Sequence, residues 1–154
     1  VETHPLAIAL VNVHPHTTLG AKFSMPHAVA AALATGSGGA EAFGARTLNE
    51  PTIARLRDRV TVVLRETILP PPHDRPAKVV VELQNGARIE MECLSAIGGP
   101  DRPLPPQTVF DKVAALAAPV YPNILPVLEA LGTLEHSRLQ TGWSNIVGEI
   151  TGHT

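Results

Sequence analysis

Hydrophobic and polar positions along the first third of the chain predict one strand followed by two helices. Residues 6–13 (LAIALVNV) form a short run that is apolar on both faces, which is typical of a central strand. Residues 23–34 carry apolar side chains at helical spacing, with Ser24 as the expected N-cap. An Asn-Glu-Pro sequence then opens a second expected helix over residues 49–59, with Asn49 as its N-cap.

The rest of the chain predicts three strands and two more helices. Residues 60–66 are rich in β-branched side chains and indicate a strand. Residues 78–83 (KVVVEL) and 87–93 (ARIEMEC) flank an Asn-Gly pair, which favours a type I′ turn and antiparallel pairing of the two strands. Charged and apolar side chains alternate in the second of them, so one sheet face is expected to be solvated. Residues 107–118 and 124–131 show helical patterns.

This order of elements, β-α-α-β-β-β-α-α, predicts an α+β fold: one small, mixed and mostly antiparallel sheet of about four strands with a layer of helices. A chain of 154 residues fits one domain, and the sequence shows no internal repeat. We expect that domain to span residues 1–131. Residues 132–154 are weakly patterned and are expected to be a tail that either docks on a partner or is disordered. The chain also starts without a methionine, which favours a processed or excised piece.

Composition and charge exclude several classes of protein. Hydrophobic residues make up 44% of the chain and charged residues 17%, which is typical of a globular protein. A net charge of −2 with no basic stripe argues against a nucleic-acid partner, and no apolar run is long enough to span a membrane. The single cysteine, Cys93, excludes a disulfide framework and a cysteine-based zinc site, and it suits a cytoplasmic location.

Motifs for nucleotide or metal chemistry are weak. The sequence contains no Gly-x-Ser-x-Gly nucleophile elbow and no Walker-type lysine. Residues 36–41 lack the third glycine of a dinucleotide-binding fingerprint, and they follow a predicted helix instead of a strand. His14 and His16 could begin a metal site, but such a site needs a third ligand that the spacing does not supply. We therefore expect neither a cofactor nor a metal.

The richest segment is the loop-to-helix junction over residues 17–27, which gathers Lys22, Ser24 and His27. Free N–H groups and the positive dipole end at a helix start suit a carboxylate ligand, and Lys22 would add a full charge. Ser24 could cap the helix and also reach a ligand, while the imidazole of His27 suits acid–base work. On the alternative interpretation Ser24 is only a cap, Lys22 a solvated charge and His27 a partly buried helix residue.

The same segment carries a family resemblance. Residues 17–36 (TTLGAKFSMPHAVAAALATG) are similar to the signature of the MmgE/PrpD family, the 2-methylcitrate dehydratase-like proteins, which reads roughly Thr-x-Leu-Glu-(Ala/Gly)-Lys-Phe-Ser. Further landmarks follow in the family's order: LNEP at residues 48–51, LQNG at residues 83–86 and GGPDRPL at residues 98–104. The resemblance covers residues 6–131 and is to the C-terminal lid domain only.

The resemblance implies an incomplete enzyme. Family members combine a large helical domain with a smaller α+β lid, and their active site lies in the cleft between the two. They act without a required cofactor on small polycarboxylates, by dehydration, decarboxylation or epimerisation, and are usually dimers. The helical domain has no counterpart in this sequence. We therefore expect a lid domain or small subunit, inactive alone, that needs a helical partner. The alternative is a non-catalytic binding or oligomerisation module that keeps the lid fold.

The resemblance also implies roles for the junction residues. Lys22 and Ser24 would help to hold a substrate carboxylate, and His27 would act catalytically as proton donor or as an orienting group. Two positions depart from the family pattern: Gly20 replaces the usual Glu, and His27 replaces a Tyr that faces the cleft in relatives. These departures favour a substrate other than methylcitrate.

Overall fold

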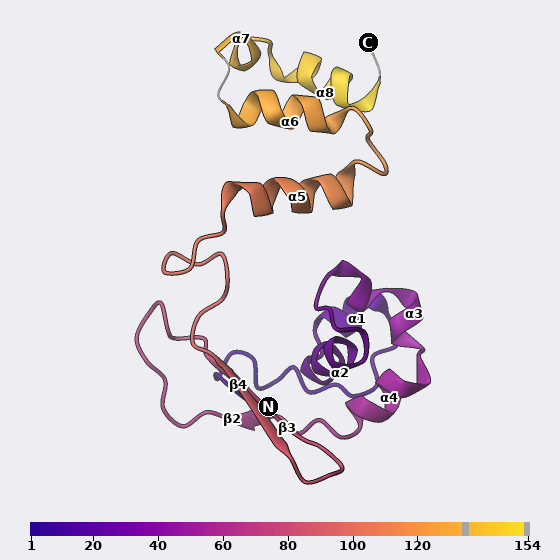
Figure 1. Cartoon of the computed structure of the whole chain (residues 1–154), viewed down its shortest axis with the longest axis vertical. Coiled ribbons are helices and arrows are strands. Elements are labelled where there is room, and N and C mark those ends of the chain that lie inside the picture. Colours follow the sequence, from indigo (N-terminus) through magenta and orange to yellow (C-terminus); the bar gives the residue numbers. More distant parts are fainter. Residues whose placement is uncertain (134–135, 153–154) are drawn as a thin grey trace. The chain divides into compact units, whose positions relative to one another are not determined.

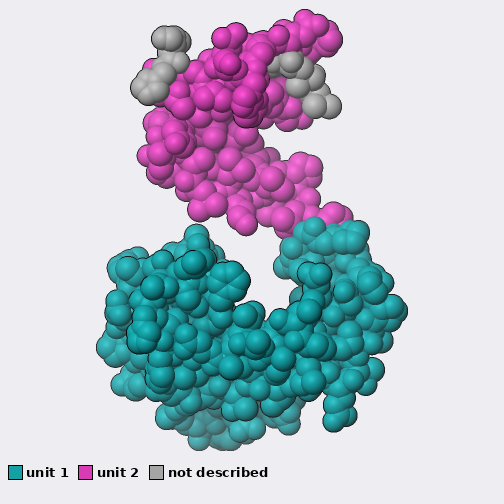
Figure 2. All heavy atoms as spheres, turned by 180° about the vertical axis from the view of Figure 1, so that it is seen from behind, with its two compact units in different colours: residues 1–102 teal, residues 103–154 magenta. Residues whose placement is uncertain are grey.

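The computed structural model describes residues 1–133 and 136–152. They form two compact units, residues Val1–Arg102 and Pro103–Thr154 (Figure 2). The expected domain boundary at residue 131 falls inside the second unit and stays a prediction.

The first unit contains a four-stranded mixed sheet, which confirms the predicted α+β fold (Figure 1). Its spatial order is β2-β1-β3-β4, where β1 pairs parallel with β2 and antiparallel with β3, and β3 pairs antiparallel with β4. The strands are β1 (Glu2–Thr3), β2 (Val63–Leu64), β3 (Ala77–Glu82) and β4 (Arg88–Cys93). β2 lies inside the predicted strand over residues 60–66 but is much shorter.

The predicted strand over residues 6–13 is wrong, because this segment consists of turns and irregular backbone. The N–H of Ala7 donates to the carbonyl of His4, and the N–H of Leu10 donates to the carbonyl of Ala7, both at 3.0 Å. The carbonyl of Leu10 in turn accepts the N–H of Met25 at 2.8 Å. These groups serve turns and a helix start, so they are not available to a strand ladder.

Helices follow this irregular segment and lie between it and β2 in the sequence. They are α1 (Thr18–Lys22), α2 (Met25–Thr35), the 3₁₀ helix η1 (Ala40–Phe43), α3 (Ala45–Leu48) and α4 (Pro51–Arg57). α2 confirms its predicted N-cap, Ser24, and Gly36 ends the helix in the left-handed region with φ of 72°. α4 begins later than predicted, because Glu50, not Asn49, is its N-cap. The Glu50 carboxylate accepts the N–H of Ile53 at 2.7 Å.

Small side chains build the core of this helical part. Ala30, Ala31 and Ala42 are buried together with Ile53, and Phe43 and Leu56 pack against them. α2 contributes the small side chains of Ala30 and Ala31 to this cluster, and α4, which packs against α2, contributes the larger side chain of Ile53. Burial of the Ile53 side chain contributes about 1.5–3 kcal/mol.

The hairpin of β3 and β4 confirms the predicted antiparallel pairing but not the predicted turn. The N–H of Gly86 donates to the carbonyl of Leu83 at 3.0 Å, and the N–H of Leu83 donates to the carbonyl of Ala87 at 2.8 Å. Gly86 has φ of 82°. The connection is therefore a three-residue loop with a left-handed glycine in its last position, the arrangement of a G1 bulge, and not a two-residue type I′ turn.

Charged side chains gather on one face of the hairpin, as predicted. Glu90 accepts from Lys78 at 2.9 Å and from Arg88 at 2.7 Å. The hydrogen bond from Lys78 is the main reason why the pKa of Glu90 lies below its ordinary value of 4.5. On the other face Met91 is 72% exposed and Ile89 is exposed as well, so neither face of β4 is buried.

The second unit is helical. It contains α5 (Pro106–Ala117), α6 (Ile124–Gly132), α7 (His136–Leu139) and α8 (Trp143–Thr151). The helices predicted over residues 107–118 and 124–131 are confirmed as α5 and α6. α6 and α8 lie side by side, and each contributes a buried residue, Val127 and Ile146 (Figure 1). Residues 134–135 and 153–154 of the expected tail lie outside the described residues. Across the described chain, every helix is too short or too polar to cross a membrane.

Candidate functional site

The junction between α1 and α2 holds two of the predicted site residues in different environments. Ser24 is buried, and its hydroxyl accepts the N–H of His27 at 3.1 Å and donates to the carbonyl of Asn12. Lys22 ends α1 with an exposed side chain, and the adjacent Phe23 is 59% exposed. Ser24 therefore fixes the backbone of the junction, while Lys22 and Phe23 form its surface.

The ring of His27 is fully buried, at 0% exposure, and both of its nitrogens have partners. Nε2 lies 2.9 Å from the carbonyl oxygen of Ala42, and Nδ1 lies 3.3 Å from Nη1 of Arg57. Because a guanidinium can only donate, Nδ1 is the acceptor, and the hydrogen of the neutral ring is on Nε2, which donates to Ala42. The ring also tilts against Phe43, with centroids 5.8 Å apart.

His27 thus joins α2 to η1 and α4 in one polar network. The carbonyl of Ala42 also accepts from Thr47 Oγ1 at 2.8 Å, which adds α3 to the network. In this arrangement neither ring nitrogen is free to exchange a proton with a substrate, so a proton-donor role would require the Arg57 side chain or the η1 backbone to move. The catalytic role of His27, and the substrate-binding roles of Lys22 and Ser24, stay predictions.

Arg57 is the residue that the sequence interpretation missed. Its side chain, at the end of α4, is buried, with 6% of the residue exposed, and no described residue forms a hydrogen bond with its buried Nε atom. Within the described residues, no carboxylate forms an ion pair with it. The signal that could have identified it is its spacing: Arg57 follows the buried Ile53 by four residues and so shares its helix face, whereas Arg55 and Arg59 are exposed.

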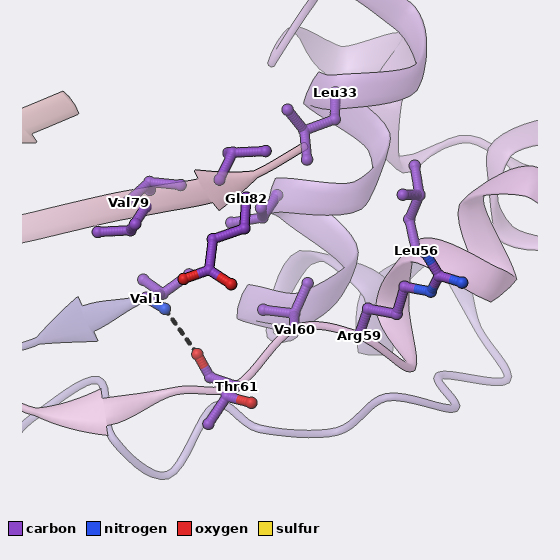
Figure 3. Close-up of a pocket in the computed structure, with 11 residues that line it drawn as sticks. Val1, Leu33, Leu56, Arg59, Val60, Thr61, Val79 and Glu82 are labelled. Carbon is purple, nitrogen blue, oxygen red and sulfur yellow. Dashed lines mark hydrogen bonds between the residues drawn. The ribbon is translucent and has the colours of Figure 1, made fainter. Parts of the chain in front are cut away.

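A pocket of about 470 Å³ lies between β3 and the helices α2 and α4 (Figure 3). Its walls are mostly apolar and include Leu33, Leu56 and Val79. The carboxylate of Glu82 points into this space, near Val1 (Figure 3). The cationic side chain of Arg59 also lines the pocket, whereas none of Lys22, Ser24 or His27 does. The pocket is therefore distinct from the predicted site.

The loop after β4 contains a second polar cluster. Arg102 Nη1 lies 3.2 Å from the sulfur of Cys93 and 3.0 Å from the carbonyl oxygen of Ser95. The hydroxyl of Ser95 donates to Asp101, and this hydrogen bond is the main reason why the pKa of Asp101 lies below its ordinary value of 3.8. These contacts close the loop after β4 on itself, so we assign them a structural role.

The described residues contain no group of three His, Cys, Asp or Glu side chains placed to hold a metal ion. His14 and His16 thus gain no third ligand from the described part of the chain.

Comparison with known proteins agrees with the resemblance of the junction segment. Residues 1–125 match the family model of the MmgE/PrpD C-terminal domain. A comparison with curated proteins finds no match. The family model extends past the end of α5 to the start of α6.

Proposed function

The chain belongs to the MmgE/PrpD family through its C-terminal domain, and from this premise we propose that it is the lid domain or small subunit of a cofactor-independent lyase or isomerase. The substrate is a small polycarboxylate, which the complete enzyme dehydrates, decarboxylates or epimerises. A helical domain or subunit completes the active site, so the isolated chain is inactive. The family match over residues 1–125 is the observation that carries this proposal.

The surface around the junction supports a covering partner. Leu19, on α1, is 64% exposed, and Phe23 is 59% exposed beside the ammonium-bearing Lys22. Large apolar side chains that gather on a surface mark interaction sites more often than single exposed ones do. We propose that the helical partner covers this apolar surface, with the substrate between the partner and Lys22.

Each of the three junction residues then has a different proposed role. Lys22 offers an exposed positive charge to a substrate carboxylate. Ser24 positions Lys22, because its hydroxyl caps α2 and ties the junction to Asn12. His27, with both nitrogens engaged, acts as an orienting group more readily than as a proton donor. We further propose that the protein is a cytoplasmic homo-oligomer and that it binds neither nucleic acid nor a membrane.

The test begins with native mass spectrometry of the protein purified from its own source. A mass well above one or two copies of 16.3 kDa, with a helical polypeptide attached or fused, supports the proposal and identifies the assembly to screen with polycarboxylates. Turnover of a polycarboxylate that falls at least tenfold in Lys22→Met then confirms the site. A homodimer or monomer without turnover contradicts the lyase assignment.

His27 is tested in the same assembly. General acid–base catalysis typically contributes a factor of about 10²–10⁴. A rate for His27→Ala within about threefold of the wild type, measured on folded protein, would remove the catalytic role.

One observation favours a second function, a non-catalytic binding or oligomerisation module. β4 is an edge strand, and its apolar side chains Ile89 and Met91 are exposed. Exposed apolar edges are templates for pairing with another chain. A stable homodimer that dissociates when Met91 is changed to Lys, and that shows no turnover, would support this function over the first.

A further inference from the structure

The central strand β1 is much shorter than its neighbour β3. β1 comprises Glu2–Thr3 and lies between β2 and β3, whereas β3 extends over Ala77–Glu82. Glu2 lies opposite Lys78 in antiparallel register, so the positions of β3 after Lys78 have no strand partner in β1. The pocket of about 470 Å³ lies beside these positions, and we call it the β1 slot.

The walls of the β1 slot are two stretches of backbone and one helical face. One side is formed by residues 59–61, which lead into β2, and the other by residues 79–82, which belong to β3. Val1 lies at the end of the slot nearest to β1, and Leu33 of α2 and Leu56 of α4 line it as well (Figure 3). The slot therefore continues the line of β1 between the same two neighbours.

Backbone groups of β3 that point into the slot lack partners. The N–H of Leu83 donates to the carbonyl of Ala87, so the ladder between β3 and β4 uses the backbone of every second residue of β3, including Val81. The N–H and carbonyl groups of Val80 and Glu82 then point to the other side, into the slot. They form no backbone hydrogen bond there with any described residue.

The wall on the β2 side has the same property. The carbonyl of Thr61 accepts the N–H of Val1 at 2.6 Å, and the N–H of Val63 donates to the carbonyl of Val1 at 2.7 Å. The next groups of this parallel ladder are the N–H of Thr61 and the carbonyl of Arg59, and neither is paired within the described part of the chain. Unpaired strand edges are templates for an added strand, and here two such edges flank one slot.

We propose that the β1 slot receives an extended strand of the helical domain or subunit, running in the direction of β1. This inference rests on the proposed function, which supplies that partner. A second copy of the chain is a poor source, because an inserted strand needs both of its edges free. Each described strand already pairs with at least one neighbour, so none of them can enter the slot without leaving its own sheet.

The flanking residues define the chemistry of the inserted strand. Its position opposite Val81 lies on the same sheet face as the buried Thr3, so an apolar side chain fits there. Its positions opposite Val80 and Glu82 lie on the face that carries the charged side chains of the hairpin, so polar side chains fit there. No described residue forms an ion pair with Glu82, and a basic side chain opposite it would supply one.

The experiment uses the 154-residue chain with the tripeptide Lys-Val-Thr fused directly before Val1 as the probe strand. In the register of β1 this places Thr opposite Val80, Val opposite Val81 and Lys opposite Glu82. We expect the amide hydrogen exchange of Val80 and Glu82, followed by NMR, to slow by roughly tenfold or more relative to the unextended chain. The amide of Val81 serves as an internal reference, because it already belongs to the ladder with β4, and should change less.

Val-Lys-Thr, fused at the same place, is the matched control. It has the same composition but turns the lysine towards the face that requires an apolar side chain, so it should protect Val80 and Glu82 much less. Equal exchange with the two extensions, or no slowing with either, overturns the inference. Protection that rises with the concentration of the unextended chain would identify a second copy as the occupant and would also overturn it.

The source of the strand is tested in the assembly purified with its helical partner. Val80 and Glu82 amides that exchange more slowly in this assembly than in the isolated chain support the proposal. Equal exchange in the two samples contradicts it. The measurement requires no turnover, so an assembly that turns over a polycarboxylate but leaves these amides unprotected would refute the strand and leave the lyase proposal standing.

Discussion

The Nδ1 atom of His27 lies 3.3 Å from Nη1 of Arg57, although 30 positions separate the two residues. This contact joins α2 to α4 beside a buried cluster of three alanines and one isoleucine, Ala30, Ala31, Ala42 and Ile53. Its direction is fixed, because the guanidinium donates and the imidazole accepts. His27, which the sequence placed at a junction predicted to bind a ligand, is therefore also a structural link of the helical part.

Replacing His27 by alanine should lower the free energy of unfolding by about 2–4 kcal/mol, because the change opens a cavity and removes the hydrogen-bond partner that the buried Arg57 guanidinium has among the described residues. Urea unfolding of the 154-residue chain measures this loss. His16→Ala, at an exposed histidine, serves as the control and should change stability by less than about 0.5 kcal/mol. Equal stability of the two variants would contradict the structural role.

Replacing Ser24 by alanine should cost about 1–2 kcal/mol, because α2 loses its N-cap and the carbonyl of Asn12 loses a donor. Thermal unfolding followed by circular dichroism is a suitable measurement. Ser144→Ala makes the same change at an exposed position in the first turn of α8, where the N-cap is Gly142. This control should leave the midpoint of thermal unfolding almost unchanged. A Ser24 variant as stable as the Ser144 variant would show that the cap is dispensable.

Replacing Gly86 by alanine should destabilise the hairpin by about 1–2 kcal/mol, which is the cost of a left-handed conformation with a Cβ. The cost comes from the backbone alone, since nothing lies within 4 Å of the added methyl group. Gly132→Ala provides a comparison of opposite sign: Gly132 is the last residue of α6, also with open space, and the change should be neutral or stabilising by up to about 1 kcal/mol. Hydrogen exchange of β3 and β4 amides localises the effect.

Acid should destabilise the protein in part through Glu50. Backbone N–H groups of Thr52 and Ile53 hold the pKa of Glu50 below its ordinary value of 4.5. A carboxyl with a lowered pKa in the folded state stabilises the protein above 4.5, and this contribution is lost as the pH falls through the lower, folded value.

The measurement for Glu50 is the midpoint of thermal unfolding from neutral pH to below 4.5. Glu50→Gln should show a smaller acid-induced fall than the wild type, while Glu50→Asp, which retains a capping carboxylate, should keep the wild-type fall. Parallel curves for Glu50→Gln and wild type would contradict the assignment.

Local signals in the sequence were sufficient for part of the fold. Ser24 marked the start of α2, and the Asn-Gly pair predicted the hairpin, because caps and turns depend on neighbours along the chain. Residues 6–13 misled, because their apolar run resembles a strand while their backbone bonds to the start of α2. That choice depends on a tertiary hydrogen bond from Met25, which no local pattern reports.

In the candidate site, too, local patterns predicted some features, whereas others depend on tertiary contacts. The sequence identified Lys22, Ser24 and His27 through a contiguous motif, and the cap function of Ser24 followed from its position before α2. The burial of His27 and its contact with Arg57 depend on how α4 folds back, and Arg57 differs in the sequence from the exposed Arg55 and Arg59 only by its register with Ile53. Pairing across 30 residues requires the assembled helices.

The alanine-rich core of α2 and η1 restricts how this domain can change over evolutionary time. Side chains at Ala30, Ala31 and Ala42 have almost no atoms to lose, so nearly every substitution there adds volume and forces the helices apart. In cores with larger side chains, a substitution that adds volume at one position can be compensated by a smaller residue at another. In this cluster such a compensating substitution is possible only at Ile53, Phe43 and Leu56. We therefore expect natural variants to hold Gly, Ala, Ser or Cys at the three alanine positions, with most of their divergence displaced to the exposed helix faces and the hairpin.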